Sequence, residues 1–500
     1  MSDGAAGEGR GGETVATGIV SLAASQVAFI LFSYLFYIYL ARKLGPADYG
    51  LFGFVFTVLV WLELLTCGSR DALIKYLNAY PDLHFLLRRP FLLAQTCVSL
   101  GFTALAYLAA LPLAFVHTRY GLLFFVAFLD LPLMGFYQLY VGYLNGFRLY
   151  TRQAIAIGIY SVTKAGAIIL FVQLGHGVGG ALFGNIFSTI LAFLAAYLFY
   201  FPRSREEARM GAAEIPAPHQ GAAWEGELAL GRIVKSSFLF VLVPLFYNLL
   251  MSMDIWVVNL AVGGETVGFY VAASTVAKSV FFLFSAFYLT LFPVTVSSFR
   301  EEDPGKIRGI FALSFRIFFC IALPASLLLS LNAGEIARLV YGAAYQRTGS
   351  IITVLAIAHF LLSLNVYLLY LLFAGGRQRQ AVRIILLTMT WGVAAICLLT
   401  AWKGATGAAV GAGLTAFVGA ALSYLVIHRD MGLSWPLRRL AEGVFLALSC
   451  FLPLAFLPKN EISFLPLSLL FALIYYLALR RRGFLEIHAR KVRRITEGDR

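Results

Sequence analysis

The sequence predicts an all-α polytopic membrane protein with about 14 transmembrane helices. It has 500 residues, of which 60% are hydrophobic and 13% are charged, whereas soluble proteins carry about 25% charged residues. Apolar runs recur from end to end, and each is long enough to cross the ~30 Å hydrocarbon layer of a bilayer. We expect two pseudo-symmetric six-helix lobes, followed by a C-terminal pair of helices.

The predicted spans fall into three groups. Six form an N-lobe over residues 18–201, at about 18–40, 50–68, 91–114, 121–142, 153–174 and 180–201. A polar linker, 202–235, leads to a C-lobe over 236–427, with spans at about 236–258, 268–291, 309–331, 348–373, 384–402 and 405–427. The last pair, about 440–457 and 463–479, lies within 428–479, between a cytoplasmic tail at 1–17 and a basic one at 480–500.

Three short motifs occur once in each lobe, which predicts an internal duplication. Each consists of glycine-rich residues next to a span. The pairs are Leu44–Phe52 with Val262–Tyr270, Asn145–Arg148 with Ala374–Arg377, and Gly177–Gly184 with Gly404–Gly411. Their offsets are 218, 229 and 227 residues, in the same order along the chain. Internal repeats around a central site are typical of transporters.

The distribution of Lys and Arg predicts the orientation. With the N-terminus inside, cytoplasmic segments carry 29 of the 39 basic residues, outer loops carry seven, and three lie within spans. Both termini are therefore expected in the cytoplasm. Positive-inside loops account for the net charge of +14 without a nucleic-acid partner.

Several of these motifs together resemble the polysaccharide transporter family, the Wzx-type flippases of the multidrug/oligosaccharidyl-lipid/polysaccharide exporter superfamily. They are the Leu44-Gly-Pro-x-x-Tyr-Gly-x-Phe52 hairpin, Asp254, Tyr341-Gly-x-x-Tyr345, Gly375-Gly-Arg377 and the Gly404–Gly411 pattern. The resemblance runs from about residue 18 to 425. It implies two six-helix lobes around a central cavity that opens alternately to either side. It also implies a cargo of polyprenyl-pyrophosphate-linked sugars or oligosaccharides, moved to the outer leaflet for cell-surface polysaccharide or glycan export.

Three basic residues within spans are the candidates for binding the substrate headgroup in that cavity. Lys164 and Lys278 are predicted near the middle of the membrane, where a charge is costly and usually functional. Their ammonium groups would attract the anionic pyrophosphate. The alternative is that each lysine pairs with a buried carboxylate and holds helices together. For Arg316, about two turns from the cytoplasmic end of its span, snorkelling to the lipid headgroups is the favoured interpretation.

Two aspartates within spans are candidates for ion coupling or charge pairing. Asp130 lies centrally in the fourth span, and structural pairing is favoured there. Asp254 lies in the outer third of the seventh span, which also contains Pro244. A carboxylate there can bind H⁺ or Na⁺ and couple a gradient to gating, or pair with a lysine.

Signals for an enzyme are poor. The five cysteines lie inside spans, the seven histidines are scattered, and no phosphate-binding loop occurs in the sequence. We expect no catalytic residues, no metal and no cofactor apart from possible H⁺ or Na⁺ coupling. A membrane glycan polymerase or ligase is the weakest alternative, because the longest outer segment, about 332–347, is too short for a catalytic domain.

The main alternative function is a cation-coupled multidrug exporter of the same superfamily. Such exporters have twelve spans as a rule and acidic cavities, whereas this chain has two lysines at mid-membrane and two further helices. The expected partners are the lipid-linked glycan and the bilayer, with the protein a functional monomer that works beside polysaccharide assembly machinery. The expected location is a prokaryotic cytoplasmic (inner) membrane.

Overall fold

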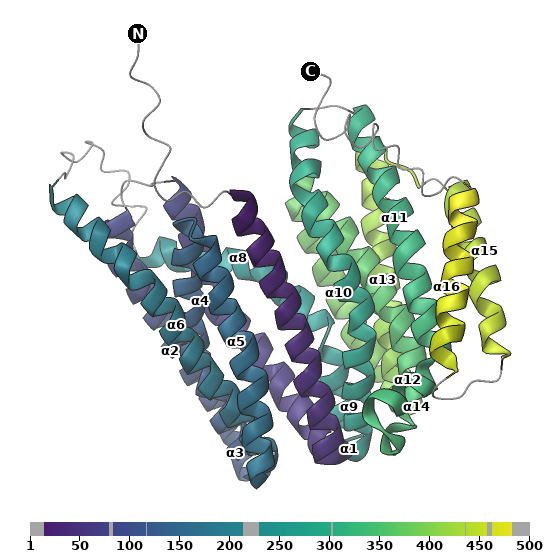
Figure 1. Cartoon of the computed structure of the whole chain (residues 1–500), viewed down its shortest axis with the longest axis horizontal. Coiled ribbons are helices and arrows are strands. Elements are labelled where there is room, and N and C mark those ends of the chain that lie inside the picture. The colour runs from purple at the N-terminus through teal and green to yellow at the C-terminus, as the bar shows by residue number, and fades with distance from the viewer. Residues whose placement is uncertain are drawn as a thin grey trace. The chain divides into compact units, whose positions relative to one another are not determined.

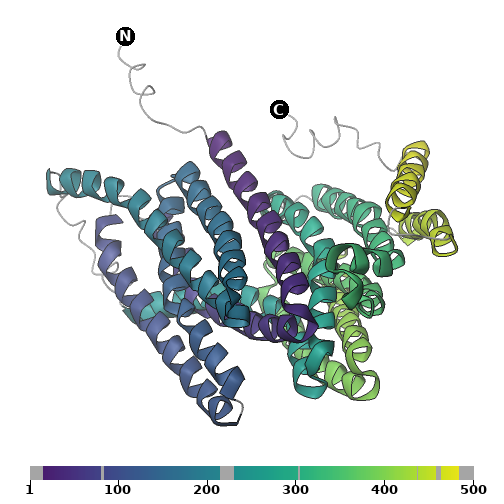
Figure 2. The same ribbon diagram turned by 60° about the horizontal axis from the view of Figure 1, so that its bottom comes forward.

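The computed structural model describes residues 15–79, 84–116, 118–213, 230–301, 304–435, 437–457 and 463–482, and these residues form helices with short connections and no strand (Figures 1 and 2). Most of the predicted tails 1–17 and 480–500 lies outside the described residues, as do residues 214–229 of the predicted linker 202–235.

In the first half of the chain, the described residues form mostly long helices. They are α1 (Val15–Ala79), α2 (His84–Val116), α3 (Thr118–Phe128), α4 (Asp130–Gly146), α5 (Tyr150–Phe171) and α6 (Gly177–Ala213), with a π-helical turn at Val172–His176. The second half contains α8 (Leu230–Leu250), α9 (Met253–Ala261), α10 (Gly264–Arg300), α11 (Pro304–Leu331), α12 (Ala333–Tyr341), α13 (Thr348–Ala374) and α14 (Gln378–Met431). Two more helices, α15 (Leu437–Phe451) and α16 (Phe464–Arg481), end the described chain.

The membrane crossings agree with the predicted number. Nine helical stretches in the described residues are long and apolar enough to span a bilayer. Three of them, 53 to 59 residues long, contain two predicted crossings each. The segment α8–α9 and the shorter apolar helix at Leu440–Ala455 supply the remaining two of the fourteen predicted spans.

The backbone confirms the internal repeat. Gly177 has φ 54° and ψ −137°, and Gly404 has φ 59° and ψ −138°. Gly45 and Gly263, which begin the two hairpin turns, have φ 75° and 69°. Only glycine adopts these conformations readily, so the turns recur because glycine recurs. The repeat is thus a repeat of structure and not only of composition.

The remaining motif pair, Asn145–Arg148 with Ala374–Arg377, forms the same turn in both halves, with the register shifted by one residue. Phe147 (φ −82°, ψ 6°) matches Gly375 (φ −80°, ψ 12°), and the next residue in each half has positive φ. The structural offset is therefore 375 − 147 = 228, one less than predicted from the sequence. The turn-closing hydrogen bonds agree, since Leu149 N donates to Leu144 O and Arg377 N donates to Leu372 O, both at 2.8 Å.

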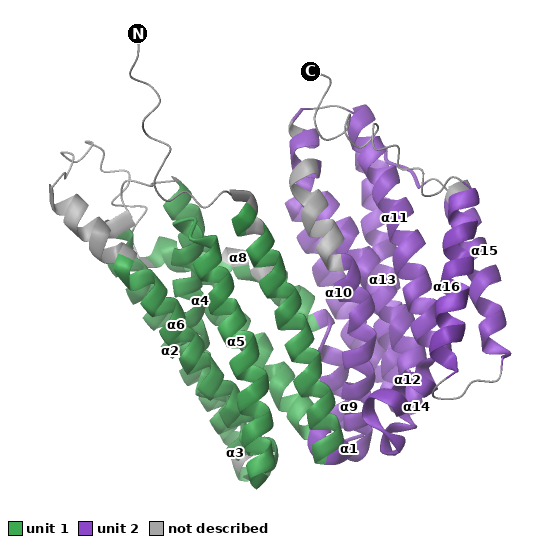
Figure 3. Ribbon diagram, in the orientation of Figure 1, with its two compact units in different colours: residues 1–44, 51–249 green, residues 45–50, 250–500 purple. Residues whose placement is uncertain are grey.

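The chain divides into two compact units (Figure 3). Unit 1 contains residues 1–44 and 51–249, and unit 2 contains residues 45–50 and 250–500. In unit 1, α6 packs against α2, α3, α4 and α5. In unit 2, α13 packs against α10, α11, α12 and α14 and is the most enclosed of the spanning helices, with 78% of its apolar window buried.

The two hairpin motifs meet inside unit 2, because residues 45–50 belong to that unit. A Cβ atom on Gly50 would lie 2.5 Å from the backbone N of Gly268, so these backbones touch directly. The Tyr49 ring packs edge-on against Tyr345, whose own ring packs against Tyr341. Within unit 2, residues 45–50 of the first hairpin motif therefore pack together with the motifs at 262–270 and 341–345. The predicted outer loop at 332–347 is itself largely helical, as α12.

Candidate functional site

Both intramembrane aspartates stand at the start of a helix. A break at Leu129 divides the predicted span 121–142 into α3 and α4, and Asp130 is the first residue of α4. A break at residues 251–252 likewise divides span 236–258, and Asp254 lies in the first turn of α9. Free N–H groups and the helix dipole favour a negative charge there. At Asp254 the break provides a partner that an uninterrupted helix would lack, because Ile255 N donates to its Oδ1 at 2.9 Å.

In unit 1, four helices bring charged side chains together. Glu63 on α1 and Asp130 on α4 lie within hydrogen-bonding reach of each other, and both are almost fully buried. Asn185 on α6 donates from Nδ2 to Asp130 Oδ2 at 2.7 Å. Lys164 on α5 is near enough to interact electrostatically with both carboxylates. We call Glu63, Asp130, Lys164 and Asn185 the unit 1 cluster.

Lys164 points into the interior of its own unit. Its side chain is 7% exposed, and Nζ donates to Tyr160 Oη at 3.0 Å. The ammonium also lies 4.9 Å from the ring centroid of Phe56 and 5.9 Å from that of Phe36, which are cation–π distances. No salt bridge involving Lys164 occurs among the described residues. The aromatic rings hold the cation, and the carboxylates act on it from farther away.

In unit 2, Asp254 is fully hydrogen-bonded. Its Oδ2 accepts from Tyr270 Oη at 2.7 Å, and its Oδ1 accepts from the backbone N of Ile255 at 2.9 Å. Lys278 on α10 interacts electrostatically with Asp254, so one positive charge balances one negative charge. The carboxylate and the partly exposed lysine form a balanced pair within one unit.

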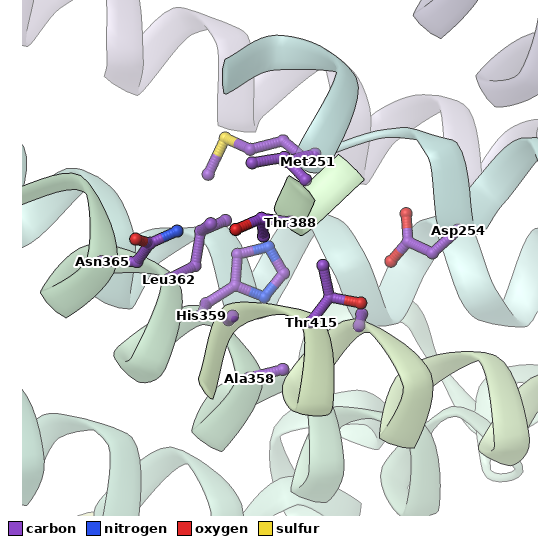
Figure 4. A pocket seen from close by; sticks show the side chains of 11 residues that line it. Met251, Asp254, Ala358, His359, Leu362, Asn365, Thr388 and Thr415 are labelled. Atoms are coloured by element: carbon purple, nitrogen blue, oxygen red, sulfur yellow. The ribbon is translucent and has the colours of Figure 1, made fainter. Parts of the chain in front are cut away.

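A pocket with a mixed polar and apolar lining adjoins Asp254 (Figure 4). Its volume is ≈ 10 Å³, about the room for one water molecule, and His359 of α13 projects into it beside Thr388 and Thr415. His359 is 4% exposed; Nδ1 contacts Leu355 O at 2.9 Å, and Nε2 has no hydrogen-bond partner in the structure. His359 also lies close enough to Lys278 for electrostatic interaction. The pocket therefore combines an acid, a base and hydroxyl groups in an otherwise apolar unit.

Arg316 lies on the face of α11 that packs towards α15 and α16. Cys320, one turn away, interacts electrostatically with Arg316 and packs against the cluster formed by α15 and α16. Leu323 and Leu327, on the same helical face, pack there too. The structure therefore places Arg316 towards the C-terminal helix pair and does not join it to the lysines.

Some polar residues of these clusters were not predicted as site residues. The sequence-based prediction gives no role to Glu63, His359, Asn365, Thr388 and Thr415. The sequence signal available was a buried-type polar residue inside a long apolar helix, since α13 is almost wholly apolar around His359 and Asn365. No group of three or more His, Cys, Asp and Glu side chains suited to a metal occurs among the residues that the structure describes.

Comparison with known proteins identifies the family and the fold. Residues 15–299 match a family described as "Polysaccharide biosynthesis protein". No curated protein matches the chain. A solved structure of the lipid II flippase MurJ, in an inward closed conformation, superposes with a TM-score of 0.71 at 14% identity, covering 95% of this chain and 99% of that one.

Transporters of a second kind share the fold. An inward-facing multidrug resistance MATE family transporter of the MOP superfamily has a TM-score of 0.65 at 18% identity, covering 83% of this chain and 98% of that one. A MOP superfamily transporter from Pyrococcus furiosus has a TM-score of 0.59 at 18% identity, covering 84% and 96%. At these identities the similarity establishes the fold, which is that of multi-pass membrane transporters.

Proposed function

Because the chain belongs to the polysaccharide biosynthesis protein family, we propose that it is a flippase for polyprenyl-pyrophosphate-linked sugars or oligosaccharides. It moves them from the cytoplasmic to the outer leaflet by alternating access, for export of cell-surface polysaccharide or glycan. The observation that carries the proposal is the shared fold with a lipid II flippase along 95% of the chain, combined with the family match. No catalytic residue is assigned.

The chemistry of such a cargo explains the need for buried cations. The polyprenyl tail can stay in lipid, whereas the pyrophosphate would cross the hydrocarbon at a high energetic cost without a positive partner. Lys278 is the best-supported partner, because it is only partly buried and interacts electrostatically with one carboxylate, that of Asp254. An arriving pyrophosphate competes with Asp254 for the ammonium group of Lys278. The pyrophosphate leaves that ammonium group when the cavity opens to the other side.

The other two basic residues are less suited to direct contact. Lys164 is enclosed by aromatic rings and needs a side-chain rotation to reach a ligand. Arg316 faces the C-terminal helix pair. Lys164 and Arg316 therefore remain predicted headgroup ligands, and Lys278 is the strongest of the three candidates.

The setting of the protein completes the proposal. We place it in a prokaryotic cytoplasmic membrane with both termini in the cytoplasm, on the bias of Lys and Arg between loops. It acts as a monomer beside polysaccharide assembly machinery.

The experiment is a leaflet assay in proteoliposomes with a fluorescent polyprenyl-pyrophosphate sugar. A membrane-impermeant reductant quenches only the outer leaflet, so the quenched fraction reports translocation. We expect wild type to translocate the lipid and Lys278→Ala to lose at least about tenfold in rate, which corresponds to about 1.4 kcal/mol. Lys278→Arg, which keeps the charge, is the matched variant and retains more of the rate.

The MATE-like fold supplies the second candidate, a cation-coupled multidrug exporter. Wild-type vesicles that move none of several lipid-linked sugars but export cationic dyes would favour it over the flippase. Loss of folded Lys278→Ala protein, with wild type active, would show that Lys278 is structural and leave the flippase assignment standing.

A further inference from the structure

Tyrosine side chains gather in unit 1 where α4 ends. Tyr140 and Tyr143 of α4 pack against Tyr200 of α6, with ring centroids 5.5 and 4.8 Å apart. Arg88, in the second turn of α2, is exposed and interacts electrostatically with Tyr140 and Tyr143. Guanidinium and phenol hydroxyl groups both donate hydrogen bonds, so together they suit an anionic oxygen. We call Arg88, Tyr140 and Tyr143 the α2–α4 site.

The hydroxyl group of Tyr143 is not used by the protein itself. The side chain is 1% exposed, and Oη has no hydrogen-bond partner in the structure. A buried polar group without a partner is costly, so an acceptor supplied by a ligand would relieve that cost. Since Arg88 interacts electrostatically with this hydroxyl group, the acceptor expected there is negatively charged.

A strained arginine adjoins the site. Arg148 has φ 59° and is the one non-glycine residue with positive φ in the described part of the chain. The repeat places Gly376, with φ 73°, at the same position of the corresponding turn in unit 2, where a residue without a Cβ atom fits better. Arg148 is exposed and follows Phe147, whose ring stacks on that of Tyr143 at 6.3 Å. Unit 1 therefore keeps a positive charge beside the α2–α4 site at a cost in stability.

The arginines of the two units differ in how their charges are balanced. At the corresponding turn of unit 2, Asp430 pairs with Arg377 at 3.3 Å and with Arg429 at 2.7 Å. Neither Arg88 nor Arg148 forms a salt bridge with any residue that the structure describes. Two positive charges beside the tyrosines are therefore not neutralised by the described residues, and an anionic ligand would balance them.

The apolar surface next to the site distinguishes a lipid from a free ion. Helices α2 and α6 both pack on α4 and contact each other. Leu93 on α2 is 60% exposed, and Leu194 and Leu198, one turn apart on α6, are 44% and 61% exposed. A phospholipid bound here would place its acyl chains along these leucines and its phosphate at Arg88, whereas inorganic phosphate would gain nothing from them.

We propose that the α2–α4 site binds the phosphate group of an anionic membrane phospholipid. Arg88 pairs with a phosphate oxygen, and the hydroxyl groups of Tyr140 and Tyr143 donate to the phosphate. Arg148 contributes a second positive charge. With the proposed topology the lipid lies in the cytoplasmic leaflet. The site needs neither the transported cargo nor Lys278, so its test is independent of the proposed function.

Native mass spectrometry of the purified full-length protein in neutral detergent measures lipid binding without transport. The protein is titrated with phosphatidylglycerol, with phosphatidylcholine, and with phosphatidylglycerol in the presence of inorganic phosphate at matched ionic strength. We expect saturable binding of phosphatidylglycerol, at least about tenfold tighter than that of phosphatidylcholine, whose own cation competes with the arginines. Inorganic phosphate is expected to leave this binding unchanged, because it has no acyl chains.

Arg88→Gln is expected to weaken phosphatidylglycerol binding at least about tenfold, because it removes the charge beside the two hydroxyl groups. Arg377→Gln is the matched control. It removes the same charge from the corresponding turn of unit 2, where Arg377 already pairs with Asp430, and leaves the affinity unchanged. The difference between the two variants separates a specific site from the general attraction of anions to a basic protein.

Two further variants separate binding from folding. Tyr143→Phe removes a hydroxyl group without a partner, so its Tm without lipid is equal to or above that of wild type, while its phosphatidylglycerol affinity falls about threefold or more. Arg148→Gly relieves the strained turn, so its Tm rises while its affinity falls. A misfolded variant cannot show a higher Tm.

The proposal is overturned if phosphatidylglycerol and phosphatidylcholine bind equally, or if Arg88→Gln and Arg377→Gln have equal effects. It is also overturned if inorganic phosphate displaces the lipid, since the site then recognises free phosphate. Unchanged affinity in both Tyr143→Phe and Arg148→Gly would likewise contradict it.

Discussion

The unit 1 cluster and the Asp254–Lys278 pair are built on the same repeated backbone but balance their charges differently. In unit 2 both oxygens of Asp254 accept hydrogen bonds, and one lysine balances one carboxylate. In unit 1 two carboxylates share one lysine, and three oxygens have no hydrogen-bond partner among the described residues: Glu63 Oε1, Asp130 Oδ1 and Asn185 Oδ1. Hydrogen bonding is therefore complete at Asp254 and incomplete in the unit 1 cluster.

The repeat makes this difference specific. With the hairpin offset of 218, Glu63 corresponds to Phe281 and Asp254 to Phe36; with the offset of 228, Lys164 corresponds to Gly392 and Asp130 to Ala358. These four charged residues thus have apolar or small counterparts in the other half, although the turns at Gly45 and Gly263 and at Gly177 and Gly404 recur.

The largest effect on stability is expected from Asp254→Ala. It removes two hydrogen bonds and leaves the ammonium of Lys278 without its partner, which costs about 3 kcal/mol of unfolding free energy. Reversible unfolding of purified protein measures the change. The double variant Asp254→Leu/Lys278→Met regains most of it, because no unpaired charge remains.

The matched change in unit 1 is Glu63→Gln, and its expected cost is below about 1 kcal/mol. The new amide group donates a hydrogen bond towards Asp130 and removes one of two neighbouring carboxylates. Two results would contradict this contrast between the Asp254–Lys278 pair and the unit 1 cluster. One is that Asp254→Leu/Lys278→Met is no more stable than Asp254→Ala. The other is that Glu63→Gln loses more than about 1 kcal/mol of unfolding free energy.

An intermediate effect is expected at the repeated helix contacts. A Cβ atom on Gly184 would lie 2.7 Å from the Cα of Ile168, and one on Gly411 would lie 2.8 Å from the Cα of Ile396. Gly184→Ala and Gly411→Ala force the same helix pairs apart, and each lowers the unfolding free energy by about 1–3 kcal/mol. The two losses agree if the halves share this packing.

Gly101→Ala is the control for that pair, since no atom lies within 4 Å of a Cβ placed there. It leaves the stability unchanged or slightly higher, because alanine favours helix over glycine. Unequal losses from Gly184→Ala and Gly411→Ala, measured by the same unfolding transition, would show that the repeat does not extend to these contacts.

The smallest effect is expected from Arg316→Gln. The guanidinium lies on the face of α11 towards α15 and α16, so its loss reduces lipid translocation by less than about threefold, under ~1 kcal/mol. The leaflet assay, run beside Lys278→Gln, measures both. If Arg316→Gln and Lys278→Gln lower the translocation rate equally, both residues contact the headgroup, which is one of the roles that the sequence predicts for Arg316.

The sequence predicted the spans and the repeat because both leave local signals. Apolar length marks each crossing, and glycine marks the turns at positions 45, 177, 263 and 404. The breaks at Leu129 and Ser252 were missed, because they interrupt apolar runs without a glycine or proline directly at the break. Asp130 and Asp254 therefore looked like mid-helix charges rather than first-turn residues.

The candidate clusters were only partly predictable. The sequence singled out Lys164, Asp130, Lys278 and Asp254 as costly intramembrane charges, and the structure groups them by unit. It could not assign Glu63 to Asp130, or His359 to Lys278, because each pairing joins helices far apart in the chain and depends on their packing. The direction in which Arg316 points likewise depends on where α15 and α16 pack.

The most direct measurement is lipid translocation by wild type, Lys278→Ala and Lys278→Arg in proteoliposomes. The fluorescent polyprenyl-pyrophosphate sugar reports the leaflet, as above. We expect wild type to move the lipid, Lys278→Ala to lose at least about tenfold in rate, and Lys278→Arg to retain more of the rate. Wild type that moves no lipid would contradict the flippase, and equal rates for wild type and Lys278→Ala would contradict headgroup binding at Lys278.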